Sequence, residues 1–255
     1  MNTETSKVKS LSKALKVLEC FNSNTPELGI TQISKMLNLN KSNVFNIITT
    51  FEQDGYLEKD ENTGKYHLGL KLLEFSFVIN EHIGYQRLLY DIMKDVSKKL
   101  NAITYFAILK NDMVFYLCNS YPPAELYSYP FRTIIGEKAP LYCTSLGKAM
   151  LAFLPQEDIE RYICTFEKIK YTENTLTDEA ELRNEIVLTR SRGYSLDNEE
   201  HEYGIKCIGV PVFSANGALK GAFSASSSTF SFSEENMEYY SNIMKEAAFH
   251  MHERF

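Results

Sequence analysis

The 255-residue sequence lacks the features that mark several large classes of protein. No apolar run approaches the ~18 residues of a transmembrane helix, so we expect no membrane span. The N-terminal stretch MNTETSKVKS is polar, unlike the apolar centre of a secretory signal peptide, and predicts no export. The cysteines are odd in number, five, and form no Cys-x-x-Cys pair, which is typical of a reduced cytoplasmic protein with free thiols.

Catalytic and metal-binding motifs are missing as well. A cysteine hydrolase requires Cys143 or Cys207 near a histidine, but no nucleophile motif surrounds either cysteine. No pair of potential ligands has metal-site spacing, apart from His250 and His252 near the C-terminus. A zinc site that recruits His201 and Cys207 is the second enzyme hypothesis, beside the cysteine hydrolase. We therefore predict that the protein is not an enzyme and has no metal and no cofactor.

The composition is that of an ordinary globular protein, with 44% hydrophobic and 24% charged residues. The net charge of −6 argues against a protein that coats nucleic acid. The charge is unevenly distributed, because residues 1–80 contain nine Lys, seven Glu and two Asp and are therefore neutral. This distribution allows a small DNA-reading module beside a larger acidic domain, and the length allows one or two domains.

Residues 8–53 have the pattern of three short helices. The apolar residues that predict the first helix by their spacing are Val8, Leu11, Leu15 and Leu18. After a loop over residues 22–29, Thr31 is the expected N-cap of the second helix. The turn at residues 38–40 follows, and Asn40 should cap the third helix. That helix is expected to bury Val44, Ile47, Ile48 and Phe51.

Two short helices joined by a tight turn, the second with a polar outer surface, are typical of a helix-turn-helix. Two short strands around Asn62-Thr63-Gly64 then predict a wing. Short polar side chains on the third helix can reach base edges in the major groove, and lysines can contact phosphates. The residues predicted to contact DNA are Lys41, Ser42, Asn43, Phe45, Asn46, Thr49, Lys59 and Lys65. A three-helix bundle that binds protein is the alternative.

The rest of the chain predicts an antiparallel sheet flanked by helices, an α+β architecture. An apolar helical stretch over 70–83 is expected to connect the two parts. The segments expected to be strands are 103–109, 113–118, 205–213 and 219–226, the last two joined through an Asn216-Gly217 turn. The expected helices are 85–100, one that begins near Ser145, one from Thr177 to Gly193, and a final one capped by Ser233.

Several of these segments resemble the IclR family of bacterial transcriptional regulators. The N-terminal ones are SKALKVL at 12–18, NKSNV at 40–44, DGYL at 54–57 and YHLG at 66–69. The residues at the spacings of the family's C-terminal signature are Gly193, Asp197, Glu200, Cys207, Ile208, Gly209, Val212 and Phe213. Gly147-Lys148-Ala149 matches a second signature, so the resemblance covers essentially the whole chain.

Two residues depart from the family pattern. Ser214 stands where the signature has Asp or Asn, in the hairpin turn. Asn46 stands where many members carry Arg on the recognition helix. Arg and Asn favour different bases, so no operator sequence is carried over from the family.

The resemblance implies a two-domain regulator whose DNA affinity responds to a small-molecule effector. Its parts are a winged helix-turn-helix over 1–70, a linker helix over 71–84 and a GAF-like effector-binding domain over 85–255. It also implies a repressor that binds a palindromic double-stranded DNA operator. The homodimer is expected to form through the DNA-binding part, with a dimer of dimers as a further step. The implied effector is a small organic acid or an aromatic metabolite.

The resemblance and the expected helix start together give a set of candidate effector contacts. They are Ser145, Leu146, Gly147, Lys148, Ala149, Asp197, Cys207, Ser224 and Ser226. Ser224 and Ser226 alternate on one strand, so both hydroxyls face the same side. The helix start at Ser145 leaves N–H groups free to bind a carboxylate. An ionised Asp197 accepts hydrogen bonds only, so it is expected to repel a bare carboxylate and to favour a ligand hydroxyl.

Structural roles are the alternative for each of these residues. The serines can simply be small residues in a packed strand, and Cys207 can be a small buried hydrophobic residue. Lys148 is expected on a solvent-facing position of its helix. Glu200 is expected to fix a loop by accepting backbone N–H bonds. For the whole chain, the alternative is a ligand-binding or protein-interaction module that makes no contact with DNA.

Overall fold

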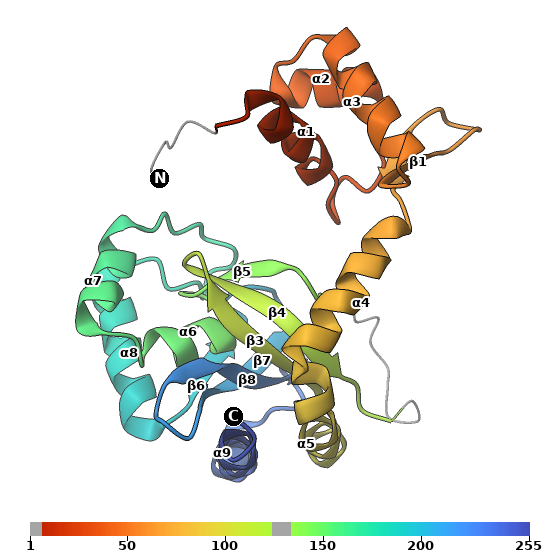
Figure 1. Cartoon of the computed structure of the whole chain (residues 1–255). Helices are drawn as coiled ribbons and strands as arrows, with labels where there is room; N and C mark the ends of the chain where they lie inside the picture. Colours follow the sequence, from red (N-terminus) through yellow and green to blue (C-terminus); the bar gives the residue numbers. More distant parts are fainter. Residues whose placement is uncertain (1–6, 124–133) are drawn as a thin grey trace. The chain divides into compact units, whose positions relative to one another are not determined.

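The computed structural model describes residues 7–123 and 134–255 and divides the chain into two compact units, Met1–Ile83 and Gly84–Phe255 (Figure 1). The first unit contains the predicted winged helix-turn-helix together with the following helix. The second contains a single six-stranded sheet with helices on both faces. Among the described helices, none is long and apolar enough to cross a membrane.

The N-terminal unit has the three predicted helices and the wing. They are α1 (Lys9–Glu19), α2 (Ile30–Leu37), α3 (Lys41–Gln53), β1 (Leu57–Lys59) and β2 (Tyr66–Leu68). The two strands pair antiparallel, with Leu57 opposite Leu68. Val17, Ile33 and Ile48 are fully buried, one from each helix, because the helices bury one face each against a shared core.

The ends of the helices differ in detail from the expectation. Thr31 lies inside α2 rather than at its N-cap, which is Gly29. The N–H of Gly29 donates to Oε1 of Gln32 at 2.9 Å, so a side chain three residues along satisfies the start of the helix. Asn40 is the N-cap of α3 as predicted, but its side chain makes no capping hydrogen bond.

The helix that follows the wing is α4 (Lys71–Ile83), within the predicted connector segment 70–83. No residue of α4 is buried within the unit. Its start is held against the base of the wing, where the N–H of Leu70 donates to Glu58 Oε1 at 3.0 Å and Phe75 stacks on Tyr56 at 5.9 Å between ring centroids. The helix thus begins at a defined point on the N-terminal unit.

The sheet of the C-terminal unit is antiparallel throughout, in the order β5-β4-β3-β8-β7-β6. The strands are β3 (Ile103–Lys110), β4 (Met113–Ser120), β5 (Lys138–Pro140), β6 (Ser195–Asn198), β7 (Ile205–Phe213) and β8 (Leu219–Ser228). Asn111 and Asp112 both have positive φ, 53° and 59°, as a two-residue hairpin turn between β3 and β4 requires. The four predicted strands are confirmed, whereas β5 and β6 were not predicted.

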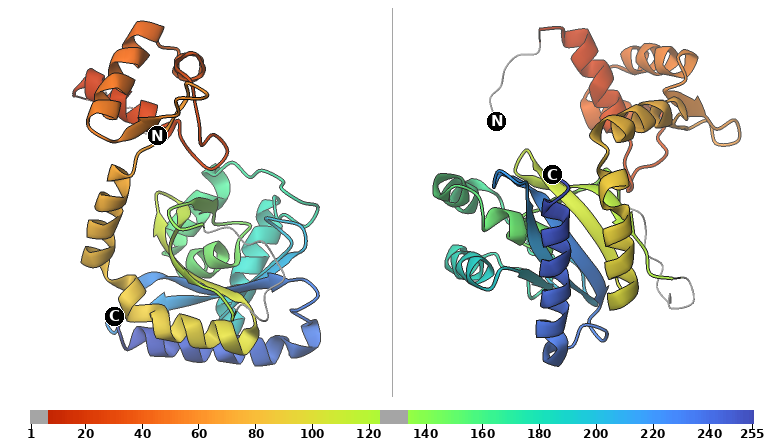
Figure 2. Two further views of the ribbon diagram at one scale, coloured as in Figure 1. Left: turned by 90° about the vertical axis from the view of Figure 1, so that its right-hand side faces the viewer. Right: turned by 60° about the horizontal axis from the view of Figure 1, so that its bottom comes forward.

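Helices cover both faces of this sheet (Figure 2). α5 (Tyr85–Leu100) and α9 (Met237–His252) lie side by side on one face. α6 (Ser145–Leu151), α7 (Gln156–Thr165) and α8 (Glu179–Arg192) are on the other side. The N-cap of α8 is Asp178 rather than the predicted Thr177. α9 follows a short 3-10 turn over Glu234–Asn236 and so does not start directly after Ser233.

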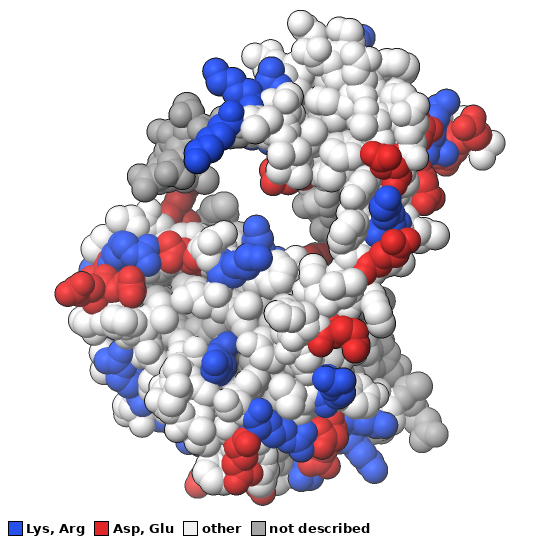
Figure 3. Space-filling model, viewed as in Figure 1, with Lys and Arg blue, Asp and Glu red and all other residues white. Residues whose placement is uncertain are grey.

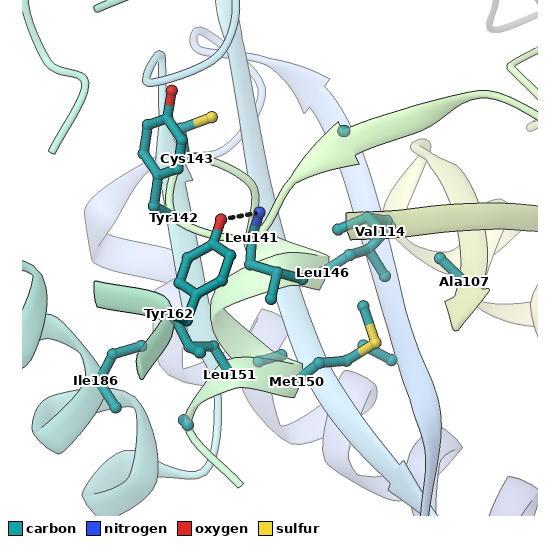
Figure 4. Packing of buried hydrophobic residues seen from close by; sticks show 14 of the residues in the cluster. Ala107, Val114, Leu141, Tyr142, Cys143, Leu146, Met150, Leu151, Tyr162 and Ile186 are labelled. Atoms are coloured by element: carbon teal, nitrogen blue, oxygen red, sulfur yellow. Dashed lines mark hydrogen bonds between the residues drawn. The ribbon is translucent and has the colours of Figure 1, made fainter. Parts of the chain in front are cut away.

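Each face of the sheet has its own apolar core. Between the sheet and α6, the buried cluster includes Ala107, Val114, Leu146 and Met150 (Figure 4). Tyr162 also lies there, and its hydroxyl accepts the N–H of Leu141 at 2.9 Å. This hydrogen bond lets a tyrosine be buried without an unsatisfied hydroxyl. The packing holds the start of α6 close to the strands.

Candidate functional site

The outer face of α3 is polar and exposed. Val44 and Ile48 point into the core, and this leaves Lys41, Ser42 and Asn43 on the surface. The remaining predicted contacts on this helix are the exposed Phe45 and Asn46 and the partly buried Thr49. A helix that is anchored by one face and carries short polar side chains on the other suits the major groove.

The lysines of this unit are distributed over α1 and the wing. Figure 3 shows basic side chains, all of them lysines in this unit, over α1, and mixed charges at the wing. Lys59 and Lys65 are exposed on the wing, where Glu61 lies 4.0 Å from Lys59. Lys9 and Lys13 are exposed on α1. Such side chains can neutralise phosphates and give salt-dependent affinity.

The second site lies on the sheet face beneath α6, where strand register aligns the predicted residues. Asp197 of β6 is opposite Cys207 of β7, and Cys207 is opposite Ser226 of β8. In the neighbouring row, Gly209 is opposite Ser224, which in turn is opposite Tyr105 of β3. Directly opposed residues project to the same face of a sheet. The sequence left the register between Cys207 and the serines open, and the structure supplies it.

A glycine in the second row brings α6 close to this surface. A Cβ added at Gly209 would lie 2.6 Å from the carbonyl oxygen of Ser145. The hydroxyl of Ser195, beside it in the row, donates to the same oxygen. The N-cap of α6 is Thr144, whose Oγ1 accepts the N–H of Gly147 at 3.1 Å. The helix start is therefore fixed against the sheet by a missing side chain and by hydrogen bonds.

A cavity of about 530 Å³ opens between this surface, the start of α6 and the loop before β7. Its lining residues are Tyr105, Tyr116, Ile134, Glu137, Lys138, Ala139, Thr144, Ser145, Leu146, Asp197, His201, Glu202, Tyr203, Gly204, Ile205, Cys207, Ser224 and Ser226. The volume is in the range of small-molecule sites, which combine apolar walls with a few placed polar groups.

Six of the nine predicted effector contacts line this cavity. They are Ser145, Leu146, Asp197, Cys207, Ser224 and Ser226. The other three do not. Ala149 belongs to the apolar core, and a Cβ on Gly147 would lie 2.4 Å from Leu141. The N–H groups of Gly147 and Lys148 are already bonded to Thr144. The expectation that they are free to bind a carboxylate was therefore wrong.

The expectation for Lys148 was wrong, because its side chain is buried, with 1% of its surface exposed. Its ammonium donates to Glu200 and lies 3.8 Å from Glu185 of α8. The expectation for Glu200 holds only in part, because its carboxylate pairs with Lys148 while the backbone N–H of Asn198 also favours its ionised form. Asp197 is the residue whose side chain accepts the backbone N–H of Glu200, at 2.8 Å. A buried amine is tolerated here because carboxylates compensate its charge.

The titratable groups around the cavity are perturbed by burial. Burial, followed by the charge of Glu200, raises the pKa of Asp197 to about 7, against the opposing effect of Lys148. Burial also raises the pKa of the Cys207 thiol and of the Tyr116 hydroxyl well above their ordinary values. Both remain neutral near pH 7. The thiol is thus a small, weakly polar group in the cavity wall rather than a nucleophile.

Sequence reasoning missed the aromatic wall and the loop of the cavity. Tyr105 and Tyr116 pack edge to face, 5.6 Å between ring centroids. Both tyrosines lie on segments predicted to be strands, 103–109 and 113–118, and this was a signal that could have been used. The loop residues His201 to Gly204 carry no comparable signal. Among the described residues, no group of three His, Cys, Asp or Glu side chains is arranged to hold a metal ion.

The two units and their sites together define a DNA-binding regulator with a ligand-sensing domain, and the comparisons with known proteins identify its family. Residues 10–61 match the IclR helix-turn-helix domain, and residues 83–252 match the bacterial transcriptional regulator IclR C-terminal domain. The chain belongs to the IclR family of transcriptional regulators, and the predicted family, fold and general function are confirmed.

Individual relatives match over nearly the whole chain. The HTH-type transcriptional regulator KdgR of Escherichia coli is 30% identical over 241 residues, which cover 94% of this chain and 90% of that protein. The relatives are transcriptional regulators rather than enzymes.

Solved structures of the same fold include an IclR transcriptional regulator from Alicyclobacillus acidocaldarius, with a TM-score of 0.84, 22% identity and coverage of 97% of this chain and 99% of that chain. An IclR homologue from Microbacterium hydrocarbonoxydans, solved as a complex with 4-hydroxybenzoate, has a TM-score of 0.82 and 23% identity, with coverage of 96% of this chain and 98% of that chain.

Proposed function

We propose that this protein is a homodimeric repressor that binds a palindromic operator through α3 and the wing. The observation that carries this proposal is the exposed polar face of α3 beside a wing with two exposed lysines. In this arrangement Asn43 and Asn46 read bases and Lys41 contacts phosphate. Half-sites are expected about one helical turn, ~34 Å, or a multiple of it apart.

Two substitutions test this assignment on the full-length protein. Asn46→Ala should reduce discrimination at one base position by ~1–3 kcal/mol, since a bidentate contact is lost. Lys41→Ala should weaken binding to all sequences alike and reduce the salt dependence. Lys170→Ala, an exposed lysine of the other unit, is the matched control and should change neither. If Asn46→Ala leaves base preference intact, the orientation proposed for α3 is wrong.

A dimer is supported by apolar side chains on two helices of the N-terminal unit. On α1 and just before it, Val8, Leu11 and Leu15 are between 50% and 56% exposed. On α4, Leu73, Phe75, Phe77, Val78 and Ile79 are between 47% and 66% exposed. Several large apolar side chains exposed on one helix are typical of an interface. We propose that a second copy covers it and that effector domains can associate further into a dimer of dimers.

The effector is proposed to be a small organic acid or aromatic compound that occupies the cavity beneath α6. Ser145, Ser224 and Ser226 supply hydroxyls, and Cys207 and Asp197 close the site. The fold neighbour with bound 4-hydroxybenzoate makes an aromatic acid a sensible first probe. Replacement of Ser224 and Ser226 by Ala should abolish the effector response and leave effector-free DNA binding intact. Unchanged effector affinity in that variant would place the ligand elsewhere.

The protein is proposed to act in the cytoplasm by binding alone, without catalysis. All five cysteines are free, which fits a reducing compartment. The perturbed thiols near the cavity are neutral, which argues against nucleophilic chemistry. Transcription of a reporter under the identified operator, with and without effector, tests the sign of the regulation.

A further inference from the structure

The charges next to the cavity do not balance. Lys148 is bonded to Glu200 and lies 3.8 Å from Glu185. Arg192 Nη2 is 2.6 Å from the same oxygen of Glu185. The two cations Lys148 and Arg192 thus neutralise the two carboxylates of Glu185 and Glu200. Among the described residues, no Lys or Arg forms an ion pair with Asp197. This aspartate is nevertheless only 5% exposed.

One further feature at this place is a buried carboxylate oxygen whose hydrogen-bonding capacity is unused. Oε2 of Glu200 is the one buried side-chain oxygen or nitrogen without a hydrogen-bond partner in the described part of the chain. Glu200 already directs its other oxygen to Lys148 and its backbone N–H to Asp197. A second full negative charge beside this carboxylate is costly, because buried charges require compensation.

The titratable groups around Asp197 are neutral or negative, apart from Lys148 and Lys138. From β7 and β4, Cys207 and Tyr116 are neutral because burial raises the pKa of each. From its own loop, His201 is kept neutral, since burial lowers its pKa. Lys148, from α6, is the cation that acts on Asp197, and Glu200 opposes it. Glu137 and Lys138 of the β5 edge and Glu202 complete the charged lining of the cavity.

We propose that Asp197 faces the effector as an uncharged carboxylic acid that donates its proton in a hydrogen bond to an anionic oxygen of the effector. This inference rests on the proposed function, because it names the ligand chemistry of the same cavity. A protonated carboxyl is a donor, whereas an ionised one is only an acceptor. The site therefore selects a carboxylate, contrary to what an ionised Asp197 predicts. It takes up a proton on effector binding only at a pH where the ligand-free Asp197 is ionised.

The protonation of Asp197 is measured in the ligand-free, full-length protein by infrared titration. Aspartate carrying ¹³C at its side-chain carboxyl shifts the C=O stretch of a protonated aspartate and leaves that of a glutamate in place. We expect one labelled band of a protonated carboxyl that disappears with a midpoint near pH 7, in line with the raised pKa of Asp197. The band should be absent in Asp197→Asn and present in Asp178→Asn, a surface control.

Two results of this titration overturn the proposal. One is the absence of a labelled band above pH 6. The other is a band that the label does not move and that Glu200→Gln removes, since the proton then resides on Glu200. If Asp197→Asn fails to fold, Glu200→Gln decides, because loss of the neighbouring charge should move the midpoint of the aspartate band to lower pH.

Calorimetry then tests the hydrogen bond to the effector, with pyruvate, D-gluconate and 4-hydroxybenzoate as probes. If the effector binds only when Asp197 is protonated, and if Asp197 titrates near pH 7, the Kd of the effector should rise about tenfold from pH 6 to pH 8. In Asp197→Asn, Kd should change less than about twofold over that range. An equal pH dependence in both proteins overturns the proposal. Binding of no probe at pH 6 contradicts the proposed carboxylate effector, and the infrared result still reports on Asp197 separately.

Discussion

Substitution of Gly209 by Ala is the sharpest test of how the cavity is built. The added Cβ would lie 2.6 Å and 2.7 Å from the carbonyl oxygen and carbon of Ser145, and 2.9 Å from Oγ of Ser195. Backbone atoms cannot rotate away, so the start of α6 must move from β7. Overpacking of this kind costs about 1–3 kcal/mol. For a unit of this size that corresponds to a decrease in Tm of about 2–12 °C.

Differential scanning calorimetry of the full-length protein measures this change, and Gly29→Ala is the matched control. Gly29 has an ordinary φ of −91°, and its added Cβ would meet only Gln32 Oε1, at 3.5 Å. We expect little change in the control. The same movement displaces Ser145 and Leu146, so effector affinity should fall together with Tm. If Gly209→Ala melts within about 1 °C of the wild type, α6 does not pack on β7 as described.

Three further predictions concern charge and assembly. Lys148→Met should destabilise the protein by about 3–5 kcal/mol in chemical denaturation, because Glu200 is left buried and unpaired. The double variant Lys148→Met with Glu200→Gln should recover most of this stability. An absence of recovery would contradict the pairing of Lys148 with Glu200. The pKa of folded Asp197, about 7, lies above its ordinary 3.8. The free energy of unfolding is therefore highest below the pKa that Asp197 has in the unfolded chain. It falls as the pH rises toward 7, because ionised Asp197 is disfavoured in the folded protein. The Tm advantage of Asp197→Asn over the wild type should thus grow between pH 4.5 and pH 7 and then stay constant; an advantage independent of pH would refute this. Leu15→Glu should convert dimer to monomer in sedimentation experiments, since charge is placed on a half-exposed apolar face, whereas Lys13→Ala should leave the mass unchanged.

Local patterns were sufficient for much of the fold. The Asn216-Gly217 turn between 205–213 and 219–226 predicted that β7 and β8 form a hairpin, because this dipeptide favours the positive φ of a tight turn between two strands. Gly193 predicted the end of α8, where the backbone adopts φ of +76°. Helix starts were less certain. Thr31 and Thr177 are acceptable caps by residue type, but the chain begins its helices at neighbouring residues, where Gln32 and Asp178 satisfy the free N–H groups.

The short strands β5 and β6 could not be found in the same way. Each has only three or four residues and lies at an edge of the sheet. Such strands are stabilised by pairing with β4 and β7, and hydrogen bonds to a partner strand leave no periodicity in the sequence. Asp197 was nevertheless selected as a site residue, because its place in the family signature was visible without knowledge of its strand.

By itself the sequence determined the family, the two-part organisation, the polar face of α3 and the two serines on one strand face, because each depends on residue type and on spacing along the chain. The tertiary structure decided how the predicted site is divided. It assigned Ser145, Asp197, Cys207 and the serines to a cavity, and turned Lys148 inward. The physical reason is that register, burial and charge compensation are relations between segments distant in sequence. Whether a lysine lies in water or beside Glu200, and whether an aspartate keeps its proton, depends on which charges the fold brings within a few ångströms.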